Sequence, residues 1–212
     1  MLSLALLASS LLYADTYTDE ATFQAQLGTS ITDNYTNSGY VFSQTDANMT
    51  AVLNETHYQS TEFPNNDLVF SGGGYEYYCA GCNGSFLLSF SQTTVGNSNG
   101  VFGVGLDLFN SSSPLYDAFV TFGNGTTADY VLPSNSDLST LTFWGITSSA
   151  EIESIYFGID GGPTGGQSFA ITNLTIGEAA APVPEPTSLL LLATVVGLVG
   201  FLTGRRRLAT RR

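Results

Sequence analysis

The C-terminal residues 182–212 constrain this 212-residue chain more than any other stretch. Residues 188–204 carry no charge and consist mostly of Leu, Val, Ala and Gly. As a helix with a rise of about 1.5 Å per residue, this run would span roughly 26 Å, slightly less than a hydrocarbon core of about 30 Å. Because a bilayer thins locally around a short span, the run predicts a single C-terminal transmembrane helix.

The positive charges of the chain all follow this apolar run. They are five arginines, and the chain has no other Arg and no Lys. Positive flanks are retained on the cytoplasmic side of a membrane, so we expect residues 1–187 outside and the tail 205–212 in the cytoplasm. Arg205, Arg206 and Arg207 then act as the stop-transfer signal.

Three prolines in residues 182–186 favour extended backbone, because proline lacks an N–H and disfavours helix in the residue before it. Together with the apolar run and the arginines, Pro184-Glu185-Pro186 resembles the PEP-CTERM sorting signal of exported bacterial proteins. The resemblance implies that a membrane-embedded exosortase, a cysteine-dependent transpeptidase-like enzyme, recognises Pro184, Glu185 and Pro186. The alternative is a plain one-span anchor behind a Pro-rich stalk. Similar tails occur in some secreted ice-binding proteins, which share the tail rather than a function.

The N-terminus predicts a secretory leader. Residues 2–12 form a short apolar run, and cleavage after Ala14 fits a signal peptide. A basic n-region is missing, so we expect the true start codon upstream of Met1. The alternative is a buried N-terminal strand. The predicted parts are a signal peptide (1–14), an exported domain (15–177), a Pro-rich linker (178–187), a transmembrane helix (188–204) and a cytoplasmic tail (205–212).

The exported part is strongly acidic. All 18 Asp and Glu residues lie between Asp15 and Glu185, where there is no Lys or Arg. Its carboxylates must therefore be satisfied by water, backbone N–H groups, hydroxyls or bound cations. Nucleic acid is excluded as a partner, since phosphate binding rests on Lys and Arg.

Short β segments separated by Gly, Asn, Ser and Pro dominate this part. Residues 19–27 have an acidic start and an i, i+4 apolar pair, which predicts one short N-terminal helix. About eight strands with little helix predict an all-β, jelly-roll-like β-sandwich. The predicted strands are 68–71, 85–91, 101–109, 118–123, 129–132, 140–146, 152–159 and 169–176.

Two further patterns support the sandwich. Asn124-Gly125 between two predicted strands indicates a hairpin with a type I′ turn, which needs positive φ at both central residues. We expect the core to contain Phe143, Trp144, Phe157 and Phe169. The segment 169–177 also resembles the last strand of sandwich domains common in proteins with this tail.

Cys79 and Cys82 are the only cysteines, spaced as C-x-x-C. A zinc site needs four ligands, and His57, the only histidine, is the one further soft candidate. A thioredoxin-like motif needs a βαβ setting, which the pattern does not offer. In an exported domain we expect a local disulfide, with redox and metal roles as alternatives. His57 has no accompanying catalytic motif and predicts an exposed loop residue.

Tyr75, Tyr77 and Tyr78 follow three glycines and precede the cysteines. In a loop held by a disulfide, exposed rings could stack on sugars, so these three are candidate ligand contacts. The alternative is that the rings cover one end of the sandwich.

Paired carboxylates are the remaining catalytic option. Glu151 with Glu153, or Asp107 with Asp117, would form the pair that glycosidases use if they met across strands. Hard oxygen ligands at predicted strand ends, Asp107, Asp117 and Asp160, also suggest a structural calcium ion. No other cofactor is expected.

Potential glycosylation sites are numerous. Seven asparagines fit N-x-[ST], and only Asn48, with Asp46 two residues before it, fits the stricter bacterial form. The seven are Asn34, Asn48, Asn54, Asn83, Asn110, Asn124 and Asn173.

The sequence therefore predicts an exported surface or extracellular-matrix protein with a non-catalytic β-sandwich that binds glycans or populates the matrix. The alternatives are a secreted carbohydrate-active enzyme and an ice-binding protein. Ice binding favours a repeated Thr-x-Thr array, and Thr16-Tyr17-Thr18 alone is no array.

Overall fold

The computed structural model describes residues 14–159 and 168–181. The chain divides into two compact units, Met1–Ala180 and Ala181–Arg212. No helix in the described ranges is long and apolar enough to cross a membrane. The predicted leader before Ala14, the predicted span 188–204 and the sorting motif all lie outside those ranges.

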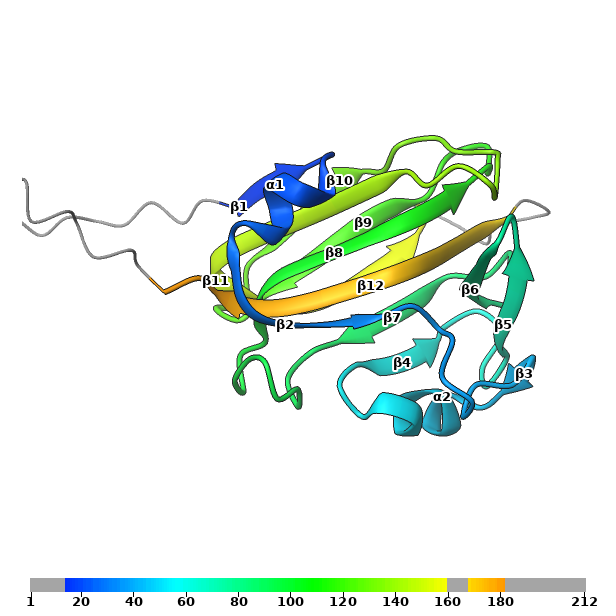
Figure 1. Cartoon of the computed structure of the whole chain (residues 1–212), viewed down its shortest axis with the longest axis horizontal. Helices are drawn as coiled ribbons and strands as arrows, with labels where there is room; N and C mark the ends of the chain where they lie inside the picture. Colours follow the sequence, from blue (N-terminus) through cyan, green and yellow to red (C-terminus); the bar gives the residue numbers. More distant parts are fainter. Residues whose placement is uncertain (1–13, 160–167, 182–212) are drawn as a thin grey trace, which may run out of the picture. The chain divides into compact units, whose positions relative to one another are not determined.

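The described residues form an all-β domain, as the sequence predicts, but with two short helices where the sequence predicts one (Figure 1). One antiparallel sheet has the strand order β10-β9-β11-β8-β12-β6-β5-β3, with β1 and β7 beside β11, β2 beside β12 and β4 beside β7. The elements are β1 (Ala14–Tyr17), α1 (Glu20–Gln24), β2 (Leu27–Asp33), β3 (Ser43–Gln44), α2 (Asp46–Leu53), β4 (His57–Ser60), β5 (Asp67–Gly72), β6 (Tyr75–Ala80), β7 (Phe86–Ser89), β8 (Val101–Asn110), β9 (Asp117–Phe122), β10 (Thr127–Val131), β11 (Phe143–Gly158) and β12 (Phe169–Ala179).

β11 joins the parts of the sheet. Its first half pairs with β8 and β1, and its second half pairs with β9 and β7. A bulge between Ile152 and Ser154 and a positive φ of 62° at Glu151 mark the change of partners. Because a bulge bends a strand and increases its twist, β11 can pair with β8 and β1 in its first half and with β9 and β7 in its second half. The sequence predicts two strands here, and the structure corrects this to one.

The core confirms three of the four predicted residues. Trp144, Phe157 and Phe169 are buried in the main apolar cluster. Phe143 is only half-buried and packs against Phe23 of α1, with ring centroids 5.5 Å apart. Neighbouring residues of a strand point to opposite faces, so Phe143 lies on the face opposite to Trp144.

The predicted helix is confirmed as α1, shorter than expected. The Asp19 side chain caps it by accepting a hydrogen bond from the Thr22 N–H at 2.8 Å. Phe23 lies fully buried over the sheet, where a Cβ on Gly105 would come within 2.6 Å of its ring. A glycine at position 105 therefore lets α1 approach the sheet.

The predicted hairpin at Asn124-Gly125 connects β9 and β10, but the type I′ turn is wrong. Phe122 N–H donates to Thr126 O and Gly125 N–H donates to Phe122 O, which closes a three-residue loop. Of the two central residues only Gly125 has positive φ, at 80°. The Asn124 side chain instead accepts from the Thr126 N–H at 3.0 Å.

Candidate functional site

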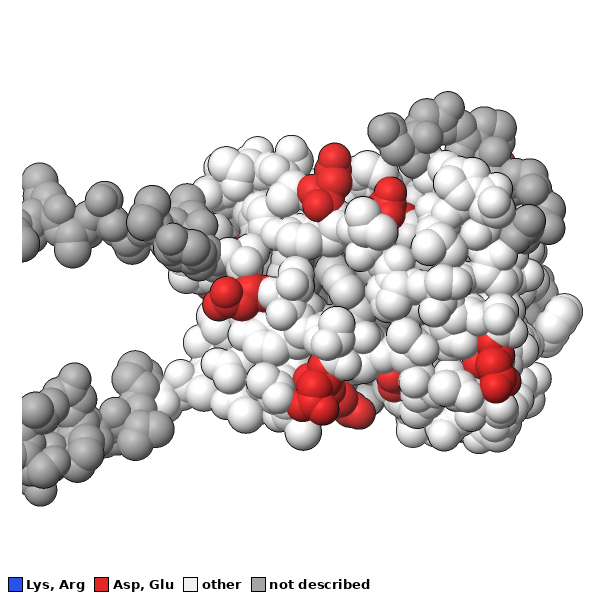
Figure 2. All heavy atoms as spheres, turned by 90° about the horizontal axis from the view of Figure 1, so that it is seen from above, with Lys and Arg blue, Asp and Glu red and all other residues white. Residues whose placement is uncertain are grey.

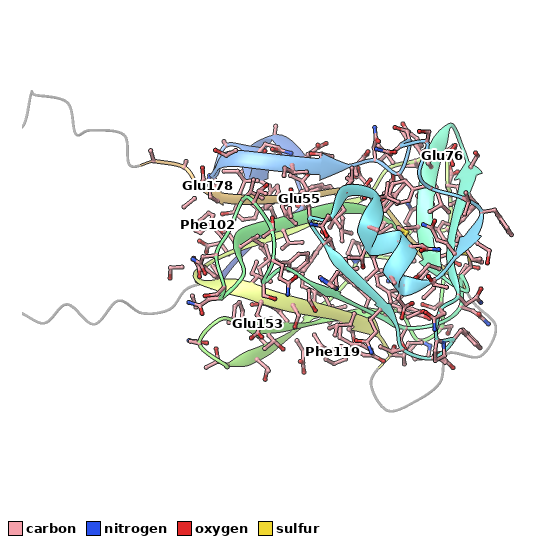
Figure 3. All side chains as sticks on the ribbon, turned by 90° about the horizontal axis from the view of Figure 1, so that it is seen from below. Glu55, Glu76, Phe102, Phe119, Glu153 and Glu178 are labelled. Carbon is pink, nitrogen blue, oxygen red and sulfur yellow. A yellow bond between two sulfur atoms is a disulfide. The ribbon has the colours of Figure 1, made fainter. Side chains whose placement is uncertain are left out.

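An open cleft of about 410 Å³ lies at the end of the sheet where β12 finishes. Side chains from β8, β11, β12 and the loop before β8 line it: Gly96, Asn97, Phe102, Ser148, Ser149, Glu151, Glu178 and Ala179. A second hollow of about 280 Å³ shares Ser148 with it and reaches Ala14 and Tyr130. Figure 3 labels Phe102 and Glu178 at this end of the domain.

Glu151 reaches the cleft because of the bulge in β11. Its Oε1 accepts a hydrogen bond from Asn97 Nδ2 at 2.5 Å. Asn97 is itself fixed, since its N–H donates to Gly100 O at 2.9 Å and its Oδ1 accepts from the Asn99 N–H at 2.7 Å. Gly100 has a φ of 121°, and a Cβ there would lie 1.9 Å from Ile152 O, so this loop requires glycine.

Phe102 supplies the aromatic surface of the cleft. It is half-buried and lies on the same face of β8 as the core residues Val104 and Leu106. Glu178 approaches from β12, exposed, with its Oε1 accepting from the Thr29 N–H at 3.3 Å. The cleft therefore combines one aromatic ring with two carboxylates, and no Lys or Arg occurs in the described ranges.

Neither of the two predicted catalytic pairs lines the cleft as a pair. Glu151 lines the cleft, whereas Glu153 is exposed and does not line it. Asp107 lies opposite Phe143 and Asp117 opposite Gly158, at the two ends of β11. The prediction that these two aspartates approach each other is therefore wrong, because β11 lies between their strands.

Asp107 is predicted as a calcium ligand, but its side chain does not face solvent. It is buried, its Oδ2 accepts from Asn173 Nδ2 at 2.9 Å, and burial raises its pKa. Asp160, the third predicted calcium ligand, lies outside the described residues. Within the described ranges, no three His, Cys, Asp or Glu side chains gather so as to hold a metal ion.

The predicted tyrosine loop is instead strand β6. Tyr78 is fully buried and its hydroxyl donates to Asp67 Oδ1 at 2.7 Å. Tyr77 is also buried, which raises its pKa to about 12, and its hydroxyl donates to Leu138 O at 2.7 Å. Only Tyr75 is half-exposed, so the interpretation as an exposed loop is wrong. The rings of Tyr77 and Tyr78 offer no accessible face for a sugar.

The Cys79–Cys82 disulfide is confirmed at the end of β6. Two consecutive residues, Gly81 and Cys82, have positive φ values of 59° and 61°, and this left-handed turn brings the cysteines together. His57 is exposed, as predicted, although it begins strand β4 rather than lying in a loop.

The structure also contains buried acidic groups that the sequence did not single out. Asp33 is buried, and its Oδ2 accepts from the hydroxyls of Tyr40 and Tyr58, while its Oδ1 accepts from the Tyr35 N–H at 2.9 Å. Burial raises the pKa of Asp33, and these donors oppose that effect. Hydroxyls thus replace the cations that the domain lacks.

A second buried acid, Asp67, lies at the start of β5. Asp67 has no exposed surface, and its carboxyl group contacts that of Asp46 at the start of α2. Burial, with a smaller contribution from Asp46, raises the pKa of Asp67 to about 7, while Tyr78 opposes the shift. No residue pattern next to Asp67 in the sequence marks it as a buried acid.

Residues 182–207 match the family described as the PEP-CTERM protein-sorting motif. The chain carries a PEP-CTERM sorting motif. This confirms the predicted resemblance over nearly the same residues. The motif implies that the protein is exported and that an exosortase processes it.

Other comparisons add little. No curated protein matches the chain. Among solved structures, two mutants of the family 29 carbohydrate-binding module CBM29-2 are similar to it. A lysine-to-alanine mutant has 15% identity and a TM-score of 0.40, over 74% of this chain and 100% of that one. An aspartate-to-alanine mutant has 16% identity and a TM-score of 0.34, over 60% and 99%. At these TM-scores the likeness carries no argument about the ligand.

Proposed function

We propose that this exported PEP-CTERM protein holds neutral extracellular polysaccharide in the cleft of its all-β domain and performs no catalysis. The observation that carries the proposal is the cleft itself, in which Phe102 lies with Glu151 and Glu178 in one open hollow. A surface that binds sugars needs an aromatic face and a few fixed polar groups, and both are present.

The chemistry of the lining favours a sugar ligand. The Phe102 ring offers an apolar face for the C–H groups of a pyranose ring. The carboxylates of Glu151 and Glu178 are hydrogen-bond acceptors only, so they suit the hydroxyl donors of a sugar. Asn97 holds Glu151 in place through its amide, which keeps that acceptor oriented.

Charge decides which class of polysaccharide fits. The domain has no Lys or Arg to pair with uronate, sulfate or phosphate groups. Figure 2 shows one face, on which the carboxylates lie in separate patches with no positive side chain between them. An anionic chain would be repelled, so the proposed ligand is neutral.

The tail completes the proposal. Residues 188–204 span the membrane before processing, and Arg205–Arg207 hold the C-terminus in the cytoplasm. The exosortase recognises Pro184, Glu185 and Pro186 and removes the tail. The domain is then kept at the cell surface or in the extracellular matrix.

Affinity electrophoresis in gels that contain a soluble neutral glucan or galactomannan tests the cleft. We expect the wild-type domain to be retarded and Phe102→Ala to lose at least about tenfold in affinity, as loss of a central aromatic contact does. Phe119→Ala is the matched control, because Phe119 is a half-exposed aromatic residue outside the cleft (Figure 3). Equal loss in both variants, or no retardation of the wild type, would contradict the proposal.

One observation favours a second function. Glu151 and Glu178 line the same cleft from different strands, as the acids of a glycosidase do. Release of reducing ends by the wild type, lost in Glu151→Gln but kept in Glu153→Gln, would show hydrolysis instead of simple binding. We expect no release from any of the three proteins.

A further inference from the structure

Two carboxyl groups meet between α2 and β5. The Asp46 and Asp67 carboxyl groups lie within hydrogen-bonding reach of each other. Asp46 Oδ1 accepts from Ser60 Oγ at 2.6 Å and from the Ser60 N–H at 3.3 Å. Asp67 Oδ1 accepts from the Tyr78 hydroxyl at 2.7 Å. Strands β4 and β6 thus each place an oxygen-bearing side chain, Ser60 and Tyr78, against the pair.

One oxygen of this pair has no partner. Asp67 is fully buried, and its Oδ2 finds no hydrogen-bond donor among residues 14–159 and 168–181. Its carboxyl neighbour Asp46 is an acceptor when ionised and so cannot satisfy it. A buried acceptor without a donor is costly, which points to a group that the protein chain itself does not supply.

The charge of the pair is also uncompensated. The chain has no Lys or Arg before Arg205, and His57, its only histidine, is exposed. The other titratable groups that act on the pair are Tyr78 of β6 and Tyr35 after β2, and both stay neutral because burial raises each pKa well above its ordinary value. A buried carboxylate in contact with a half-buried one requires a shared proton or a bound cation.

We propose that Asp46 and Asp67 form a divalent-cation site of the oxygen-ligand class that Ca²⁺ prefers. The two carboxylates and the Ser60 hydroxyl are the side-chain oxygen ligands of the proposed ion. Asp46 is exposed enough to admit the ion from solvent. When the ion binds, it replaces the proton shared by the carboxyl groups, and that proton is released to solvent.

The site has a structural consequence. Asp46 begins α2 and Asp67 begins β5, so a shared ion ties the helix to the sheet. Because proton and ion compete for the same oxygens, binding strengthens as the pH rises. This site is distinct from the cleft, whose lining includes neither residue.

Thermal unfolding of the exported domain with CaCl₂ or with EDTA, at pH 5 and pH 8, tests the site. At pH 8 and calcium about a hundredfold above its Kd, we expect Tm to rise by about 5 °C, and by much less at pH 5. Asp67→Asn and Asp46→Asn should each remove the rise, while Asp129→Asn, at an exposed position, should keep it. Titration calorimetry in buffers of different ionisation enthalpy should show proton release on binding.

Two results would overturn the proposal. One is a Tm at pH 8 that is the same with CaCl₂, MgCl₂ or EDTA. The other is an equal rise in NaCl of matched ionic strength, which would reflect screening of the acidic surface. Should either aspartate variant fail to fold, Ser60→Ala leaves both carboxylates in place, and unchanged calcium affinity in that variant would also count against the site.

Discussion

The domain has two groups of acidic residues, and they are handled in opposite ways. Glu151 and Glu178 line an open cleft and accept hydrogen bonds from an amide and a backbone N–H. Asp33 and Asp67 are buried and accept from tyrosine hydroxyls. The comparison teaches that a domain without Lys or Arg still buries carboxylates when neutral donors surround them.

The two regions consequently differ in what they can do. The acids in the cleft have carboxylate groups that line an open hollow. The buried acids are bound into an aromatic cluster in which the rings of Tyr35, Tyr58 and Tyr78 lie 4.9 to 6.4 Å apart by centroid. We therefore expect substitutions in the cleft to change binding and substitutions in the buried cluster to change stability.

The largest predicted difference comes from removing one ring in each region. Tyr78→Ala deletes a fully buried ring that contacts Tyr35, Tyr58 and Phe86, and should lower the free energy of unfolding by about 3–5 kcal/mol. Phe102→Ala at the cleft should cost about 1 kcal/mol or less. Urea unfolding of both variants measures this, and similar losses would remove the distinction between the regions.

The next effect is a pH dependence that belongs to the buried group. The pKa of Asp67 rises from 3.8 to about 7 in the folded state, so folding favours its protonated form. The stability that protonated Asp67 gives the folded domain is fully present below about pH 4 and is lost as the pH rises through 7. The free energy of unfolding falls by on the order of 4 kcal/mol over this range. The measurement is urea unfolding in EDTA from pH 4 to pH 8.

Asp67→Asn should flatten this profile, because the amide does not titrate. Glu151→Gln in the cleft is the matched control and should leave the pH profile as in the wild type. A wild-type domain that is more stable at pH 8 than at pH 5 in EDTA would contradict the account, since Asp33 and Asp107 also have raised pKa values and act in the same direction.

The smallest predicted effect comes from the disulfide. Replacing both Cys79 and Cys82 with alanine should cost about 2 kcal/mol by the chain-entropy relation for so short a loop. Neither the retention on polysaccharide nor the pH dependence should change, because neither cysteine lines the cleft and the side chains that hydrogen-bond the Asp46–Asp67 pair are Ser60 and Tyr78. Loss of retention in this double variant would show that the two ends of the domain are coupled.

Much of the fold could be predicted because apolar residues in most strands follow the strand period. β5, β8, β9 and β12 coincide closely with predicted strands. β6 was missed because Tyr-Glu-Tyr-Tyr-Cys-Ala has amphipathic residues on both faces and both faces are covered. α2 was missed because only Met49 and Thr50 are buried, so its sequence has no apolar stripe.

The candidate site was predicted in part. Glu151 was singled out, but its partner in the cleft is Glu178, which lies far along the chain on β12. The bulge at Ile152 turns Glu151 and Glu153 to different surroundings, and sequence periodicity cannot show a bulge. The Asp46–Asp67 contact depends on how α2 packs, and that packing is equally invisible in the sequence.

The potential glycosylation sites acquire a second explanation. Asn34 and Asn124 each accept hydrogen bonds from the N–H and hydroxyl of the threonine two residues on. N-x-[ST] is therefore also a turn-forming pattern, which favours it in a loop-rich domain. Asn110 is fully buried, so its side chain is not accessible in the folded state. Glycosylation at the exposed asparagines stays a prediction.

The measurement that tests the central claim most directly is the C-terminal mass of the protein recovered from its own cells, with membrane and medium analysed separately. We expect the recovered chain to end near residues 184–187 and this processing to be lost when the exosortase is deleted. An intact Arg212, found in the membrane fraction alone, would contradict the account. The tail would then be a permanent anchor, and the cleft would serve a tethered surface domain.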